Sequence, residues 1–189
     1  MIRTERLLLR RWRDEDRAPF ADLNAAPAVV EHLQGPISPE SSDAFIDRIE
    51  IGWNERGWSL WAIEVPGVAP FIGYVGLWPA DFVTGAPMVE VGWRLARQHW
   101  GHGYATEAAR ESLRFGFTDV GLDEIVSFTV PRNHRSIRVM ERIGLIRDPT
   151  GDFDHPRVDP VTYPHLVPHV FYRLPRDRWR PDRRPEAST

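Results

Sequence analysis

The chain has 189 residues, of which 42% are hydrophobic and 27% charged, and its net charge is −3. These values are typical of one globular domain, and they favour neither nucleic acid nor an anionic membrane as a partner. The sequence contains no cysteine and no lysine, which excludes disulfides, thiolate catalysis, cysteine zinc sites and nucleotide sites built on a lysine. Residues 1–16 lack the apolar run of a signal peptide, and no apolar stretch is long enough to span a bilayer, so we expect a cytoplasmic protein.

The first half of the chain is predicted to fold into one strand, two helices and a hairpin. Their ranges are, in order, 6–12, 13–24, 42–57, and 58–65 paired with 71–79. In the second helix, Ser42 can cap the N-terminus and Gly57 can end the last turn. Phe45, Ile49 and Trp53 recur there at helical spacing, which indicates one apolar face.

The second half is predicted to contain three strands and two helices, with a proline-rich loop before the last strand. The strands are 88–95, 123–130 and 169–174, the helices are about 104–120 and 133–144, and the loop is 147–166. Asn133 can cap the later helix and Gly144 can end it. The order β-α-α-β-β-β-α-β-α-β predicts an α/β fold in which helices cover a mixed sheet. We expect one domain over 1–175 and a flexible tail, rich in arginine and proline, over 176–189.

Two glycines, Gly101 and Gly103, stand directly before the helix predicted from Tyr104. Glycine lets backbone N–H groups turn towards an anion, and a helix N-terminus adds partial positive charge, so the segment suits a pyrophosphate. A dinucleotide fingerprint would need a third glycine where Thr106 stands, and a P-loop would need a lysine. On their own, the two glycines fit an ordinary strand-to-helix turn equally well.

Three segments carry recognisable motifs in a fixed order. They are TERLLLRRWRDED at residues 4–16, EVGWRLARQHWGHGYATEA at 90–108 and NHRSIRVMERIGL at 133–145. The second holds the pattern Gln/Arg-x-x-Gly-x-Gly/Ala, as Gln98-His99-Trp100-Gly101-His102-Gly103. Together they resemble the GCN5-related N-acetyltransferase (GNAT) superfamily, and within it the branch of ribosomal-protein N-terminal acetyltransferases. The resemblance extends from about Thr4 to about Leu174, and three matches in order are far more specific than one.

The resemblance implies a mixed, mostly antiparallel central sheet of about six to seven strands, with splayed central strands and about four flanking helices. It also implies acetyl-CoA as the acyl donor, no metal, and a pantetheine arm between the strand that ends at Leu95 and the strand that begins near Ile125. The residues it assigns to this cosubstrate are Trp93, Leu95, Gln98, Trp100, Gly101, His102, Gly103, Tyr104, Ala105, Thr106, Asn133 and Arg138. For Arg138, a solvated helix face is the alternative.

Acetyl transfer to an amine needs a base, a donor for the oxyanion and a proton for the leaving thiolate. The resemblance implies that Ser136 donates the proton to the leaving thiolate. The alternative is that Ser136 only caps the first turn of its helix or faces solvent there. A backbone N–H near Trp93 or Arg94 is the expected oxyanion donor. The base is either Glu90, a carboxyl within a half-apolar strand where burial would raise its pKa, or His155, whose imidazole titrates near neutral pH.

The sequence therefore predicts an acyl-CoA-dependent N-acetyltransferase that acts by direct attack in a ternary complex. The expected acceptor is a primary amine, either a protein N-terminus or a small amine. The alternative is a non-catalytic acyl-CoA sensor or an interaction protein on the same fold. We expect neither nucleic acid nor membrane as partner, and a homodimer is possible because many proteins of this superfamily dimerise. His165 and His169 lack a third ligand, which argues against a metal site.

Overall fold

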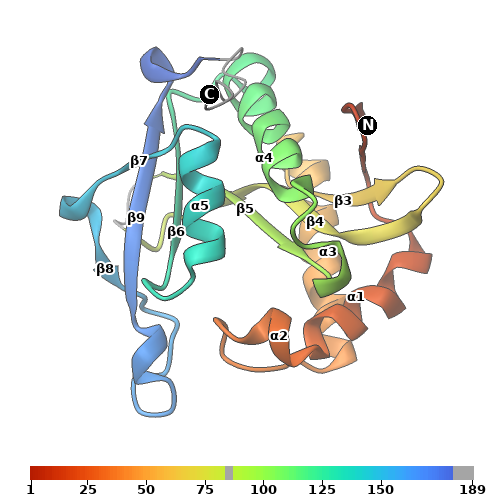
Figure 1. Ribbon diagram of the computed structural model, residues 1–189, viewed down its shortest axis with the longest axis horizontal. Coiled ribbons are helices and arrows are strands. Elements are labelled where there is room, and N and C mark those ends of the chain that lie inside the picture. The colour runs from red at the N-terminus through yellow and green to blue at the C-terminus, as the bar shows by residue number, and fades with distance from the viewer. Residues whose placement is uncertain (84–86, 181–189) are drawn as a thin grey trace.

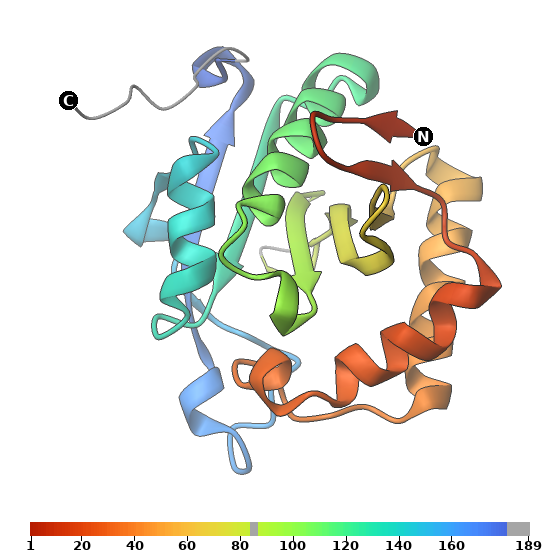
Figure 2. The ribbon, with the colours of Figure 1, turned by 45° about the vertical axis from the view of Figure 1, so that its right-hand side comes forward.

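The computed structural model describes residues 1–83 and 87–180. Within them a central sheet separates two groups of helices, and α4 and α5 lie side by side over one face of it (Figures 1 and 2). Among the described residues, no helix combines the length and the apolar character that a bilayer crossing requires.

The described part of the sheet has nine strands. In chain order they are β1 Ile2–Arg3, β2 Leu8–Arg10, β3 Leu60–Val65, β4 Ala69–Pro79, β5 Val89–Leu95, β6 Glu124–Thr129, β7 Ile146–Arg147, β8 Phe153–Asp154 and β9 Pro168–Pro175. Their spatial order is β1-β2-β3-β4-β5-β6-β9-β7, with β8 on β9. Every pairing is antiparallel except that of β5 with β6. The prediction of a mixed, mostly antiparallel sheet is confirmed. The strand count exceeds six to seven because β1, β7 and β8 have only two residues each.

Five α-helices flank the described sheet, one more than expected. They are α1 Arg17–Ala25, α2 Pro27–Val30, α3 Pro39–Arg56, α4 Tyr104–Phe115, continued by a π-helical turn over Gly116–Val120, and α5 His134–Arg142. The additional helix, α2, is one turn long, which is too short to produce a hydrophobic period. Asn133 caps α5 as predicted, with its side chain accepting the Ser136 N–H at 3.2 Å.

The predicted cap of α3 is wrong. The helix begins one turn earlier, where the Ser38 hydroxyl accepts the Ser41 N–H and Pro39 occupies the first helical position. Proline is favoured there because its missing N–H would be unpaired in any case. Ser42 lies inside the helix, fully buried, and its hydroxyl accepts a hydrogen bond from the Asn24 side chain at 2.9 Å. Gly57 does end α3, in the left-handed conformation with φ 77°.

The two faces of the sheet bury separate apolar clusters. One face packs on α4 and α5 through small and aliphatic side chains such as Ala108, Ala109 and Met140. The other packs on α1 and α3 through an aromatic cluster that includes Phe20. Small side chains on α4 let this helix approach the sheet closely. The N-terminus of α4 is thereby held beside the strands that form the centre of the sheet.

The central strands β5 and β6 diverge. They are neighbours in the sheet, but in the described residues their register contains a single pair, Glu90 opposite Val126. Beyond that pair, β5 continues to Leu95 and β6 to Thr129 without pairing to each other, and Figure 1 shows β5 turning away from β6 beneath α4 and α5. The splayed strands predicted from the family resemblance are therefore present.

The first residues of the predicted C-terminal tail lie against the domain. Residues 176–178 form a 3-10 turn, the Trp179 ring packs on the Phe117 ring with 5.2 Å between centroids, and the Arg176 guanidinium donates to the Phe117 carbonyl. The rest of that tail, residues 181–189, lies outside the described residues.

Candidate active site

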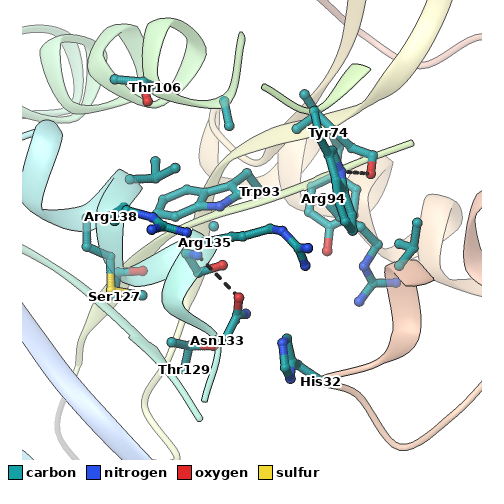
Figure 3. Close-up of a pocket in the computed structure, with 18 of the residues that line it drawn as sticks. His32, Tyr74, Trp93, Arg94, Thr106, Ser127, Thr129, Asn133, Arg135 and Arg138 are labelled. Atoms are coloured by element: carbon teal, nitrogen blue, oxygen red, sulfur yellow. Dashed lines mark hydrogen bonds between the residues drawn. The ribbon is translucent and has the colours of Figure 1, made fainter. Parts of the chain in front are cut away.

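A cavity of about 600 Å³ opens where β5 and β6 diverge. It is bounded by α2, β5, the loop before α4, the first turn of α4, β6 and α5, and Figure 3 shows side chains from several of these elements around it. All but two of the site residues predicted from the sequence line this cavity. The exceptions are Gln98, which is exposed, and His102, whose ring stacks on Tyr104 outside the lining.

The glycine loop before α4 has the backbone conformation that only glycine adopts easily. Gly101 has φ 81° and Gly103, which forms the N-cap of α4, has φ 82°. A Cβ at Gly101 would meet no atom of the described residues within 4 Å, so this backbone is open to a ligand. Arg6 fixes the loop from outside, because its guanidinium donates to the His102 carbonyl at 2.9 Å and to the Glu107 carboxylate at 2.7 Å. The unpaired N–H groups of the first turn of α4 face the same space.

The edge of β5 that faces β6 offers backbone groups in an alternating pattern. The Ala96 N–H donates to the Ile72 carbonyl at 2.9 Å, so the alternation of an antiparallel ladder turns the even-numbered residues of β5 towards β4. The odd-numbered residues Trp93 and Leu95 therefore turn their N–H and carbonyl groups towards the gap. The Leu95 carbonyl already accepts a hydrogen bond from the Trp100 indole N–H at 2.8 Å, so the free groups are the N–H and carbonyl of Trp93 and the N–H of Leu95. Of the two expected oxyanion donors, Trp93 has a free N–H and Arg94 is paired with β4.

Glu90 stands at the point where the two strands part. Its backbone lies opposite Trp78 on β4 and Val126 on β6, and its half-buried side chain lines the cavity. Within the described residues no cation lies close enough to form an ion pair with it. Burial raises the pKa of Glu90 from 4.5 to about 8. A carboxyl with such a pKa is mostly protonated near neutral pH, so its ionised fraction, which can accept a proton, grows as the pH rises towards 8.

Ser136 lies in the first turn of α5 and lines the cavity. Its N–H is bound by the side chain of Asn133, whose amide also donates to the Thr129 hydroxyl at 3.0 Å. The Ser136 hydroxyl makes no hydrogen bond to another described residue, which leaves its proton available to a ligand. Asn133 thus holds the start of α5 against β6 and positions this serine.

His155 also lines the cavity, but among aromatic rings. The centroids of His169 and Phe82 lie 4.8 Å and 5.0 Å from its own. Its Nδ1 accepts the Arg157 N–H at 3.2 Å, so the neutral ring carries its proton on Nε2. Burial, followed by the charges of His169 and Arg157, lowers the pKa of His155 to about 4. A ring with this pKa and an occupied Nδ1 is a poor proton acceptor, which favours Glu90 as the base.

Sequence reasoning missed the side chains on the α1 and α2 side of the cavity. Tyr74 is buried and carries the Arg94 guanidinium over its ring, 5.6 Å from the centroid. Arg94 also donates to the side chain of Asn24, on α1, at 2.5 Å. His32 lies nearby (Figure 3), and burial, followed by Arg135 and His134, lowers its pKa. The available signal was alternation: Arg94 stands four residues after Glu90 and shares its face of β5.

Arginines of α5 also border the cavity. Arg135 lies over the Trp100 ring, 4.9 Å from its centroid, and Arg138 is exposed while still lining the cavity. For Arg138, the two alternatives of a solvated helix face and a contact with bound phosphate are compatible with this position. Thr106 is buried in the first turn of α4 and also borders the cavity.

The splayed central strands and the glycine loop before α4 are those of an acetyltransferase fold. The profile of the acetyltransferase (GNAT) domain family matches residues 6–146. The chain belongs to this family, which uses acetyl-CoA. The membership of the GNAT superfamily that the three motifs predicted is confirmed.

Similar proteins agree with this assignment. The uncharacterized protein YkkB of Bacillus subtilis is 35% identical over 148 residues, which cover 75% of this chain and 83% of YkkB. An FsC-acetyl coenzyme A-N(2)-transacetylase of Aspergillus fumigatus is 31% identical over 145 residues, 67% of this chain and 58% of that protein. The crystal structure of an acetyltransferase from Agrobacterium tumefaciens has a TM-score of 0.74 and 30% identity and covers 92% of both chains.

Proposed function

We propose that the protein transfers the acetyl group of acetyl-CoA to a primary amine by direct attack in a ternary complex. The observation that carries this proposal is one cavity that joins the glycine loop of α4, the open edge of β5 and the half-buried Glu90. An ordinary strand-to-helix turn would not require these three features to meet. The acceptor is a small amine or a protein N-terminus, and the similarity to ribosomal-protein acetyltransferases supports the second.

The donors and acceptors of the chain fit the chemistry of coenzyme A. The left-handed glycines Gly101 and Gly103 and the free N–H groups of α4 would hold the pyrophosphate. The free carbonyl of Trp93 and the free N–H of Leu95 would pair with the amides of the extended pantetheine arm, as an added strand does. When bound, acetyl-CoA supplies an activated thioester carbonyl.

Glu90 is the proton acceptor in this proposal. The protonated amine first passes one proton to the Glu90 carboxylate, which later returns it to solvent. The neutral nitrogen then forms a bond to the carbonyl carbon and loses its second proton to solvent as the carbon–sulfur bond breaks. A protonated amine that enters the cavity lowers the pKa of Glu90, because opposite charges favour each other's ionised form. Burial therefore raises the pKa of Glu90 and a bound cationic amine lowers it. The two effects together bring the pKa of Glu90 closer to neutral pH, where a carboxylate is a useful base.

Two donors complete the site. The Trp93 N–H would donate to the thioester carbonyl oxygen and stabilise the negative charge that develops on it. The pantetheine arm pairs with the Trp93 carbonyl and the Leu95 N–H, which leaves the Trp93 N–H free for this role. The Ser136 hydroxyl donates its proton to the sulfur as the carbon–sulfur bond breaks, and regains a proton from solvent. No covalent intermediate on the protein is needed.

Thiol release from acetyl-CoA in the presence of a panel of amines tests the proposal. We expect release that depends on both substrates and produces one acetylated amine for each thiol. Binding of CoA, measured by calorimetry, without thiol release for any amine would refute the proposal and favour an acyl-CoA sensor.

A further inference from the structure

The charged side chains around the cavity are unevenly distributed. Glu90 is the one carboxyl among the described lining residues, whereas four arginines line the same cavity. They are Arg94, Arg135, Arg138 and Arg142. Since Glu90 is assigned to the reacting amine, a second ammonium on the acceptor would find no carboxylate here, and a negative group would find several guanidinium groups.

Arg94 borders the cavity next to α1, and its partners among the described residues are both neutral. It donates to the amide oxygen of Asn24 and lies over the ring of Tyr74. Asn24 is itself fully buried and held by Ser42 at 2.9 Å, so the guanidinium has a fixed position. Within the described part of the chain, no carboxylate lies within the 4.0 Å of an ion pair to Arg94. Its charge is therefore available to a ligand, and its planar fork suits a carboxylate.

The other arginine on this side is already partly neutralised. Arg135 has the Glu31 carboxylate at 3.8 Å and the Trp100 ring beneath it. In Figure 3, Arg94, Arg135 and His32 border the same part of the cavity. Since burial lowers the pKa of His32, that ring stays neutral near pH 7 and adds no charge. Arg94 is thus the main unbalanced charge that an acceptor would meet.

We infer that the cavity selects an amine acceptor that carries a carboxylate or similar anionic group, with Arg94 as its binding residue. This inference rests on the proposed acetyl transfer and names its substrate class. It excludes polyamines as good acceptors, because each further ammonium would lie against Arg94 without a counter-charge.

The strand geometry adds a length requirement. Glu90 and Arg94 are four residues apart on one face of β5, which places their Cα atoms about 13 Å apart at the rise of a strand. The amine and the anionic group of a matching acceptor are therefore separated by several bonds.

Matched acceptors test the inference by thiol release. One series consists of ω-amino carboxylates of increasing chain length, each compared with its own carboxamide, and a peptide pair compares alanyl-aspartate amide with alanyl-asparagine amide. We expect kcat/KM to favour the anionic member by about tenfold or more, as charge-assisted hydrogen bonds do. The two series distinguish a small acceptor from a peptide acceptor.

Variants then assign the preference to Arg94. Arg94→Gln keeps a donor for Asn24 and should abolish the preference, whereas Arg94→Lys keeps the charge and should retain part of it. Arg48→Gln, an exposed arginine of α3 outside the cavity, is the matched control and should keep the full preference. An Arg94→Gln protein that retains the wild-type ratio would overturn the inference.

The wild-type protein alone is sufficient for refutation. Equal or faster use of the carboxamides, or efficient use of a polyamine, contradicts the inference even if a variant fails to fold. Absence of thiol release with every amine contradicts the proposed function instead, so the two failures are distinguishable.

Discussion

Replacing Glu90 by glutamine removes its charge and keeps its shape. Burial raises the pKa of this carboxyl from 4.5 to about 8, so between these values the folded protein holds a proton that the unfolded chain releases. The stability that this proton contributes is complete below pH 4.5 and is lost as the pH rises through about 8. Above pH 8 the wild-type protein must keep a half-buried negative charge, and the Glu90→Gln variant does not.

The size of the effect follows from the difference in pKa. At about 1.4 kcal/mol for each pKa unit, the change from 4.5 to about 8 corresponds to about 5 kcal/mol. The side chain borders an open cavity, and solvent screening reduces the expected value to about 2 kcal/mol. We therefore compare the unfolding temperature of Glu90→Gln with that of the wild type at each pH. For a chain of this length, about 2 kcal/mol should make the difference at pH 9 about 4 to 8 °C more favourable to the variant than the difference at pH 4.5.

Thermal unfolding followed by circular dichroism at pH 4.5 and pH 9 measures this difference. Glu55→Gln, at a largely exposed carboxyl of α3, is the matched control and should show the same unfolding temperature difference from wild type at both pH values. If Glu90→Gln changes the unfolding temperature equally at pH 4.5 and pH 9, burial does not disfavour the ionised form of Glu90, and the raised pKa is refuted.

The same variant tests catalysis. With Glu90 as base, the wild-type kcat/KM, which reports the free protein, should rise with pH towards a plateau above about 8, and Glu90→Gln should lower it by about a hundredfold or more. His155→Ala should leave the pH profile unchanged, because its ring carries no free basic nitrogen. If both variants keep the full rate at every pH, neither side chain is the base and substrate positioning carries the catalysis.

Three further variants probe the cosubstrate loop, the leaving group and the fold. Gly101→Leu should abolish CoA binding in calorimetry while the protein stays folded, and Gly57→Leu, at a left-handed glycine outside the cavity, should lose stability without losing CoA affinity; equal affinity in both would contradict the pyrophosphate site. Ser136→Ala should lower kcat about tenfold or more with little change in the KM for acetyl-CoA, and an unchanged kcat would remove it as proton donor. Asp16→Asn should cost about 1.5 to 3 kcal/mol in chemical denaturation, because it removes the charge that accepts two hydrogen bonds from the buried guanidinium of Arg10 and leaves Glu64, at 3.0 Å, as the remaining carboxylate; a loss below about 1 kcal/mol would show that the pair is dispensable.

Local patterns in the sequence predicted most elements correctly, and the errors have local causes. Asn133 and Gly57 act at helix ends as expected, since a cap depends on residues within one turn. The start of α3 was misplaced because Ser38 and Pro39 lie in a segment rich in turn-forming residues, which also predicts a loop. The same two residues form a helix start once the buried face of α3 packs on the sheet.

The glycine loop could be predicted because its residues follow one another in the chain. Gly101 and Gly103 precede a helix directly, and a short motif is sufficient to express that geometry. The acceptor side could not be predicted in this way. Arg94 meets Asn24 across 70 residues of sequence, and no local pattern relates the two.

The sequence by itself determined the family, the order of the longer strands and helices, the glycine loop and the absence of any cysteine or lysine chemistry. The sequence supports Glu90 and His155 equally as the base. The tertiary structure alone decided how their pKa values differ. Burial raises the pKa of one and lowers that of the other, because removal from water disfavours the charged form of each. Sequence specifies which groups can ionise, whereas their surroundings, built from distant segments of the chain, determine whether they do.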